Sequence, residues 1–278
     1  MSKKLKTLSK PRLLKLKPFL DDLVSQIEQP GYIDDDPVQF MHAFPEVADQ
    51  ELAGFFAAIM AWGRRDIVNA KVEDLLTRMN YKPSEFIGNF SDLDARHLEG
   101  FKHRTFKPED MYWLIKGLAA ILQQHNTFES FWDDCNNQAG SQKRELIAVF
   151  HERFFELHPE TPQRTRKHLS NPEKNSSAKR LYMFLRWCIR KSTVDTGIWN
   201  FLPPSALNVP LDVHVARQAR ILGLLSRHQN DWKSVVELTG RLRIMDPEDP
   251  VKYDFALFGV GVLGQKIPPE FIVNQPSS

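Results

Sequence analysis

Cysteine is scarce in this chain of 278 residues, because only Cys135 and Cys188 occur. Two thiols exclude a disulfide framework, and they exclude a zinc site or an iron–sulfur cluster held by four thiolates. The nine histidines include no HxxxH pair, so we expect no bound metal. Glycine-rich phosphate loops and a serine nucleophile elbow are also missing, which argues against nucleoside-triphosphate chemistry.

Long apolar runs are missing as well. The most apolar stretch, 52–62, is about half as long as a membrane span, so we expect no membrane contact. The first residues lack a continuous apolar core, which predicts no secretory signal. Apolar residues at 42% and charged residues at 26% are typical of a folded, soluble protein. We therefore expect a cytoplasmic protein.

The net charge is only +2, but the charges are segregated along the chain. Residues 1–17 contain seven Lys or Arg and no acid, and residues 163–191 contain nine against one acid. Acidic residues gather in 34–36 and 92–99. Such segregation is typical of proteins that bind polyanions, although charge runs also occur on solvated helix faces.

Apolar residues recur with the helical period of 3.6 through most of the chain, and no strand-like alternation persists beyond four residues. The pair Asp36-Pro37 is typical of a helix N-cap followed by proline at the first helical position. Around 52–59 a helix with small residues beside its apolar face should be buried on most sides. The fold class that we predict is all-α, with helices in the segments 38–44, 66–79, 108–124, 128–137, 143–157 and 250–260.

The most informative stretch is 169–223. It contains a turn that ends at Lys179, an amphipathic helix, a proline-rich loop, and the segment Pro210-Leu-Asp-Val-His-Val-Ala-Arg217. Here the chain resembles the helix-hairpin-helix DNA glycosylases, and the 33-residue gap from Lys179 to Asp212 is closest to the archaeal 8-oxoguanine DNA glycosylase branch. That resemblance implies a single two-lobed domain, with one lobe of about 1–59 plus 191–278 and another of about 60–190, which includes the hairpin 169–180.

A second resemblance covers nearly the whole chain. It is to an uncharacterised bacterial family known only as a domain of unknown function. The residues that carry it are Trp62-Gly-Arg-Arg65, Lys179-Arg180, Met183-Phe-Leu-Arg-Trp187 and Asp249-Pro-Val-Lys-Tyr-Asp-Phe-Ala-Leu-Phe-Gly259.

The glycosylase resemblance implies that Lys179 and Asp212 are catalytic. A neutral lysine amine can attack the anomeric carbon of a nucleotide and form a Schiff base. Asp212 follows Pro210 and precedes an apolar run, so it is placed as an N-cap. Its carboxylate could also stabilise positive charge on a sugar or move a proton. The alternative is a solvated lysine and an aspartate that only caps.

Contacts to DNA are expected from the hairpin and from a second turn. In the hairpin they would come from Asn175, Ser176, Ser177 and Arg180. The turn has no glycine, but asparagine visits the left-handed region more readily than most residues. The second turn contains Trp62, Arg64 and Arg65, and the resemblance implies that it fills the gap left by a flipped base. The alternative places Trp62 in the core and pairs both arginines with surface acids.

The base pocket implied by the resemblance contains Asp254 and Phe258. These residues are four apart and lie on one helix face. Asp254 would read a base edge, and Phe258 would stack on the base, although the archaeal branch has a larger aromatic residue here. The alternative is that Phe258 is an ordinary core residue.

The resulting functional hypothesis is a DNA base-excision glycosylase with AP-lyase activity. It would act as a monomer on double-stranded DNA with a damaged base, such as an oxidised purine, without a cofactor, and would be nucleoid-associated in the cytoplasm. A non-catalytic DNA-binding protein of the same fold is one alternative. A helical adaptor that binds acidic proteins is another. His214 and Arg217 receive no chemical role.

Overall fold

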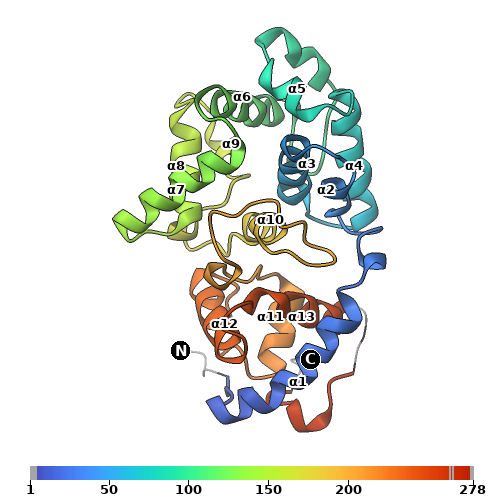
Figure 1. Cartoon of the computed structure of the whole chain (residues 1–278), viewed down its shortest axis with the longest axis vertical. Coiled ribbons are helices and arrows are strands. Elements are labelled where there is room, and N and C mark those ends of the chain that lie inside the picture. The colour runs from blue at the N-terminus through green and yellow to red at the C-terminus, as the bar shows by residue number, and fades with distance from the viewer. Residues whose placement is uncertain (1–4, 263, 265, 276–278) are drawn as a thin grey trace.

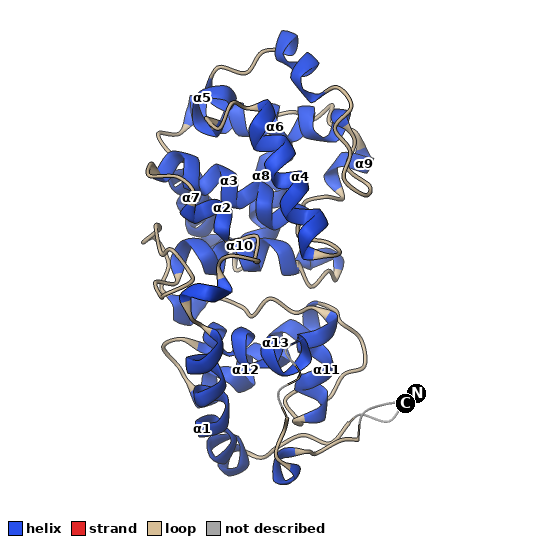
Figure 2. Ribbon diagram, turned by 90° about the vertical axis from the view of Figure 1, so that its right-hand side faces the viewer, coloured by secondary structure: helices blue, strands red, loops and turns tan. Residues whose placement is uncertain are grey.

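The protein is all-α in the computed structural model, which describes residues 5–262, 264 and 266–275 (Figure 2). Within these residues only isolated β-bridges occur beside the helices. No described helix has the length and apolar character needed to cross a membrane. The α-helices are α1 (Lys10–Ile27), α2 (Gln39–His42), α3 (Val47–Met60), α4 (Arg65–Arg78), α5 (Pro83–Gly88), α6 (Pro108–Gln124), α7 (Phe128–Gln142), α8 (Leu146–Glu156), α9 (Gln163–Arg166), α10 (Lys179–Ile189), α11 (Val213–Ile221), α12 (Trp232–Met245) and α13 (Tyr253–Val262).

Local signals explain most of these boundaries. Helix α6 begins at Pro108, where proline needs no amide partner, and it ends at Gln124 as predicted. The pair Asp36-Pro37 forms a turn instead of a helix start. The Asp36 side chain accepts a hydrogen bond from the Val38 amide at 3.1 Å, and α2 begins only at Gln39. The predicted helix 250–260 is a 3-10 turn, η5 (Pro250–Lys252), followed by α13.

The helices form two groups, one above the other in Figure 1. The upper group contains α2 to α10, and the lower group contains α1, α11, α12 and α13. In the upper group α3 packs against α2, α4, α5, α7 and α10. In the lower group α13 packs against α1 and α11. Helix α10 lies at the junction between the two groups (Figure 1).

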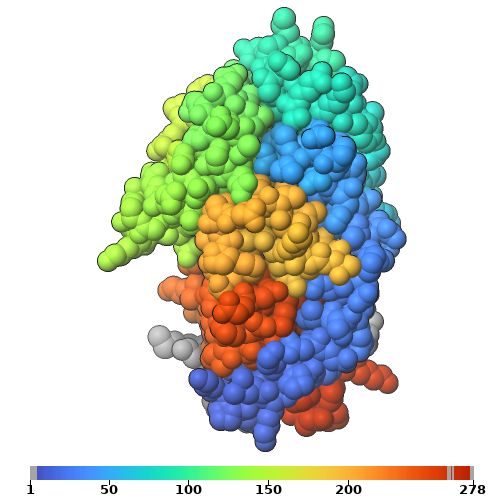
Figure 3. Space-filling view, viewed as in Figure 1, coloured from blue at the N-terminus to red at the C-terminus, as the bar shows by residue number. Residues whose placement is uncertain are grey.

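The sequence placed the boundary between lobes near residue 59, but the packing divides the chain elsewhere. Every residue of 51–60 in α3 is buried, which confirms the prediction of a helix enclosed on most sides. Such a helix needs neighbours all round, and α3 finds them in the upper group. The chain therefore passes between the groups after α1 and again after α10. On the face shown in Figure 3, the chain that follows α10 (yellow to orange) fills the junction.

Aromatic side chains dominate the core of the upper group. Trp132 and Phe150 stack at 3.8 Å between ring centroids, and Phe55, Phe128 and Phe184 surround them. Buried aromatic pairs of this kind add about 0.5–1.5 kcal/mol each beyond the area that they bury. This core fixes α3 and α10, and these two helices position one wall of the site described next.

Candidate functional site

A pocket of about 810 Å³ lies at the junction of the two helical groups. Its lining comes from the turn after α3, the hairpin before α10, α10 itself, and the lower helices α11 and α13. The volume is within the range of about 300–1,000 Å³ that is usual for small-molecule sites. Nine residues predicted from the sequence line it, namely Trp62, Arg65, Ser176, Ser177, Lys179, Arg180, Asp212, Asp254 and Phe258. Arg64 and Asn175 do not line it.

Lys179 is the first residue of α10, as predicted. The residue before it, Ala178, is in the left-handed conformation with φ of 47°, which is uncommon for a residue with a Cβ. The Ser176 hydroxyl supports this turn by accepting the Ala178 amide at 3.2 Å. Within the described part of the chain, no residue forms a hydrogen bond or ion pair with the Lys179 side chain. The turn therefore presents an unpaired amine to the pocket.

Asp212 is the N-cap of α11, which confirms the prediction of its local role. Its Oδ1 accepts a hydrogen bond from the Val215 amide at 2.8 Å, while its backbone remains extended. The same side chain lines the pocket that Lys179 enters from the opposite helical group. A carboxylate held by a cap is oriented at little entropic cost, and its second oxygen can face a ligand.

Asp254 is partly buried in α13, with 14% of its side chain exposed, and it forms an ion pair with Arg186 of α10. Burial raises the pKa of Asp254 to about 7, and the nearby Arg186 opposes that rise. Asp212 raises the pKa of Asp254 further and Lys179 lowers it, so both of these pocket charges act on Asp254. Arg186 was not predicted from the sequence. The available signal was an arginine between Leu185 and Trp187, in the most apolar part of a helix.

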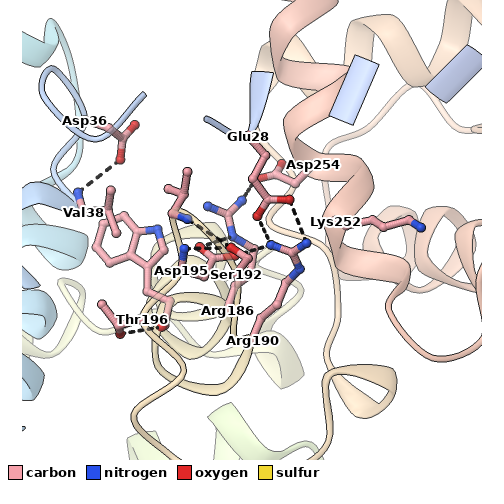
Figure 4. Close-up of polar contacts among 12 residues, drawn as sticks. Glu28, Asp36, Val38, Arg186, Arg190, Ser192, Asp195, Thr196, Lys252 and Asp254 are labelled. Carbon is pink, nitrogen blue, oxygen red and sulfur yellow. Dashed lines mark hydrogen bonds and ion pairs between the residues drawn. The ribbon is translucent and has the colours of Figure 1, made fainter. Parts of the chain in front are cut away.

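Arg186 belongs to a chain of buried charges that joins both helical groups (Figure 4). Asp195 accepts from Arg186 Nε at 3.2 Å and from Arg190 Nη1 at 2.9 Å. Arg190 also pairs with Glu28 at the end of α1, and its Nε donates to Asp249 at 2.7 Å. Because every member has a partner of opposite charge, the chain can persist out of contact with water.

The hairpin before Lys179 does not consist of two regular helices, because its segments are short. Its first part is the four-residue α9 and a 3-10 turn, η3 (Pro172–Lys174). Asn175 takes the left-handed conformation with φ of 64°, as its residue type allows. The next residue, Ser176, forms a β-bridge with Asp231, so the hairpin lies against the loop before α12. Ser176 and Ser177 face the pocket, whereas Asn175 is exposed outside it.

Arg180 turns inward from the hairpin. Its guanidinium donates to the carbonyl oxygen of Ile59 and, at 3.1 Å, to that of His168. Burial lowers the pKa of Arg180 to about 10. These contacts fasten the start of α10 to the end of α3, although the predicted contact of Arg180 with DNA stays a prediction.

The turn that contains Trp62 exposes its aromatic ring, so the alternative with Trp62 in the core does not hold. The side chain is 49% exposed, and the guanidinium of Arg104 lies 5.1 Å from its ring centroid. Gly63 has φ of 112°, and a Cβ there would collide with the Arg104 guanidinium. Both arginines of the turn are paired with acids: Arg64 pairs with Asp66 at 2.6 Å on the surface, and Arg65 with Asp36 at 3.0 Å. Arg104 was not predicted from the sequence.

Phe258 is half-buried at the pocket wall and also packs against the core, so the two interpretations from the sequence both describe part of its setting. The rings of Tyr32 and His214 meet it edge to face, each with centroids 6.5 Å away. The guanidinium of Arg65 lies over its ring at 4.9 Å. His214, which received no role from the sequence, also lines the pocket.

The fold and the site define an all-α protein with a lysine- and aspartate-bearing pocket between two groups of helices. The chain belongs to the family described as "Protein of unknown function (DUF2400)", whose model matches residues 36–263. That match spans every candidate site residue. None of the curated proteins or solved structures compared with the chain matches it. Among the described residues, no group of His, Cys, Asp and Glu is arranged to hold a metal ion.

Proposed function

We propose that this protein is a DNA glycosylase with AP-lyase activity that removes an oxidised purine, such as 8-oxoguanine, from double-stranded DNA. The observation that supports the proposal best is the meeting of Lys179, Asp212, Asp254 and Phe258 in one pocket. The motifs around Lys179 and Asp212, which resemble those of helix-hairpin-helix glycosylases, support the same function. The two-lobed glycosylase fold itself is part of the proposal.

Lys179 is the nucleophile in this mechanism. Its amine attacks C1′ of the damaged nucleotide, and the bond from C1′ to the base breaks with its electron pair leaving on the base. Asp212 stabilises the positive charge that develops on the sugar and moves the proton that the amine loses. The C1′–O4′ bond then opens, O4′ takes its electron pair and a proton, and the Lys179 nitrogen forms the Schiff base. Loss of a proton from C2′ then expels the 3′ phosphate and cleaves the strand. No cofactor takes part.

A base inside a duplex cannot reach the pocket, so the nucleotide leaves the stack first. Trp62, which is exposed at the pocket lining, is suited to occupy the gap in the duplex. Phosphate contacts from the hairpin serines and from Lys167 and Lys191, which are exposed in the basic segment on either side of the hairpin, supply much of the affinity. Such contacts weaken steeply as salt rises, because each one releases counterions.

The test is covalent trapping with borohydride on a duplex that contains 8-oxoguanine or an abasic site. The wild-type protein should form an adduct, and Lys179→Ala should lose it. Lys174→Ala is the matched control, because Lys174 is an exposed lysine of the same hairpin that does not line the pocket. An undiminished adduct in Lys179→Ala would reject the assignment of the nucleophile.

Asp212→Asn is the companion variant in the same assay. Asparagine also caps helices, so the free energy of unfolding should fall by less than about 1 kcal/mol. Excision should fall by about two or more powers of ten, because the negative charge that faces the sugar is gone. Equal turnover by this variant and the wild type would leave Asp212 with only its structural role.

The alternative functions give different results in these assays. Salt-sensitive binding to DNA without any adduct would indicate a non-catalytic DNA-binding protein. Absence of binding to DNA, together with binding to an acidic protein, would indicate a helical adaptor.

A further inference from the structure

Arg65 joins the two helical groups across the pocket. It is the first residue of α4 in the upper group, and its guanidinium lies 4.9 Å from the ring centroid of Phe258, in α13 of the lower group. The two residues are far apart in the sequence, and both line the pocket. The contact is therefore a product of the tertiary structure.

Three further contacts hold Arg65 in this place. Its Nη2 lies 3.0 Å from Asp36 Oδ2 and donates to the Tyr32 hydroxyl at 3.2 Å. Its guanidinium carbon is also 5.3 Å from the Tyr32 ring centroid. Asp36 is fixed in turn, because its other oxygen accepts the Val38 amide. Arg65 thus lies against two aromatic rings and one oriented carboxylate.

The position that the Arg65 guanidinium occupies against the Phe258 ring would also suit a nucleobase. A guanidinium is planar and packs against aromatic rings by stacking and cation–π attraction, and a nucleobase stacks on the same kind of surface. The rings of Tyr32 and His214 stand at 78° and 76° to the Phe258 ring plane, so neither of them stacks on it. A base and the Arg65 guanidinium cannot both lie against one face of the ring.

We propose that Arg65 is an internal competitor for the stacking face of Phe258, so that a base enters only when the guanidinium leaves the ring. This inference rests on the proposed function for its ligand. When the guanidinium leaves the ring, Asp36 stays beside Arg65 as a partner of opposite charge. This limits the free-energy cost of the displacement. The competition adds the same cost to every base, and bases that bind weakly are therefore kept out of the pocket.

The experiment compares two duplexes in the Lys179→Ala background, one with 8-oxoguanine and one with the abasic analogue tetrahydrofuran. The ratio of their dissociation constants isolates the contribution of the base. Arg65→Met removes the guanidinium and keeps an unbranched side chain. It should increase the preference for the base-bearing duplex about 2- to 30-fold, the range that corresponds to one cation–π contact. A duplex with undamaged guanine should shift by the same factor.

Arg153→Met is the matched control, because Arg153 makes a similar contact with Phe131, at 5.0 Å, outside the pocket. It should leave the preference unchanged. Arg65→Lys is the second variant if Arg65→Met does not fold. It keeps a charge for Asp36 but has no planar group, so the preference should still rise. An unchanged or lower preference in a folded Arg65 variant overturns the inference, and a lower one indicates that Arg65 instead adds to the stacking on the base.

Guanosine binding, measured by titration calorimetry, separates this inference from the proposed function. If the protein binds no DNA but binds guanosine, and binds it more tightly as Arg65→Met, the proposed function fails and the competitor role stands. If neither DNA nor guanosine binds, both fail. If DNA binds and the preference does not change, only the competitor role fails.

Discussion

Asp254 pairs with Arg186 and is also the residue proposed to accept hydrogen bonds from a base, and its carboxyl group serves both roles fully only in the charged form. Its Oδ2 pairs with Arg186, which favours the charged form, while burial favours the neutral form. Burial is the larger effect, so the pKa lies at about 7 instead of near 4. A neutral carboxyl accepts hydrogen bonds at fewer positions than a carboxylate does. The proposed reading of base donors by Asp254 therefore depends on pH.

Excision of 8-oxoguanine should rise as the pH increases through about 7, because Asp254 becomes the better acceptor above its pKa. The contribution of Asp254 to the free energy of unfolding changes with pH in the opposite direction. A carboxyl group whose pKa is raised on folding contributes stability that is full below its unfolded pKa and is lost as the pH rises through the folded one. Single-turnover rates of excision from pH 5.5 to 8.5 test the predicted rise in activity, with Asp254→Asn as the comparison. The same rise in Asp254→Asn would contradict the assignment.

At the scale of elements, the loop that follows α10 positions Asp195 between two arginines. The amides of Thr196 and Gly197 both donate to the Trp187 carbonyl oxygen, at 3.0 and 3.1 Å, which turns the loop back onto the helix. Gly197 has φ of 59°. A Cβ on Gly197 would lie 2.7 Å from the Lys191 Cα, which is backbone and cannot move aside. Only glycine fits this turn.

Gly197→Ala should lower the free energy of unfolding by about 2 kcal/mol or more, since the left-handed conformation alone costs about 1–2 kcal/mol with a Cβ. Gly140→Ala is the matched control. Gly140 lies in α7 with no atom near an added Cβ, so alanine should stabilise the protein by about 0.5–1 kcal/mol. Urea titrations of both variants measure the difference. Equal effects would show that the Gly197 turn tolerates a Cβ.

At the scale of the whole molecule, Arg190 ties the two helical groups together. It is the C-cap residue of α10 in the upper group, and its partners Glu28 and Asp249 belong to the lower group. Tyr182 stacks on Trp232 across the same junction, with centroids 5.7 Å apart. The pocket lies at this junction, so its shape depends on these contacts as much as on its own lining.

Arg190→Met should cost about 3–5 kcal/mol of stability, because it removes the cation from Glu28 and Asp249 and leaves the buried Asp195 with Arg186 alone. Lys82→Met is the surface control. Lys82 and its partner Glu85 are each 64% exposed, so the loss of that pair should cost less than about 1 kcal/mol. Thermal unfolding of both variants tests the contrast. A cost for Arg190→Met no larger than that of the control would show that the buried chain of charges does not hold the groups together.

The sequence by itself determined the helices and several of their ends. Helix α6 begins at its proline, and Asp212 caps α11, because periodicity, capping and proline act over a few neighbouring residues. It also indicated a left-handed Asn175 from residue type alone. The candidate residues came from spacing and resemblance, and most of them line one pocket. Their chemical roles remain predictions.

Only the tertiary structure decided which charges meet. Arg186 pairs with Asp254 across 68 positions of the chain, and Arg65 lies over Phe258 from another helix. Neither contact leaves a local pattern, because each depends on how whole helices pack and not on the period within one of them. The same reason explains why α3 joined the upper group, since an apolar helix specifies that it is buried but not which neighbours bury it.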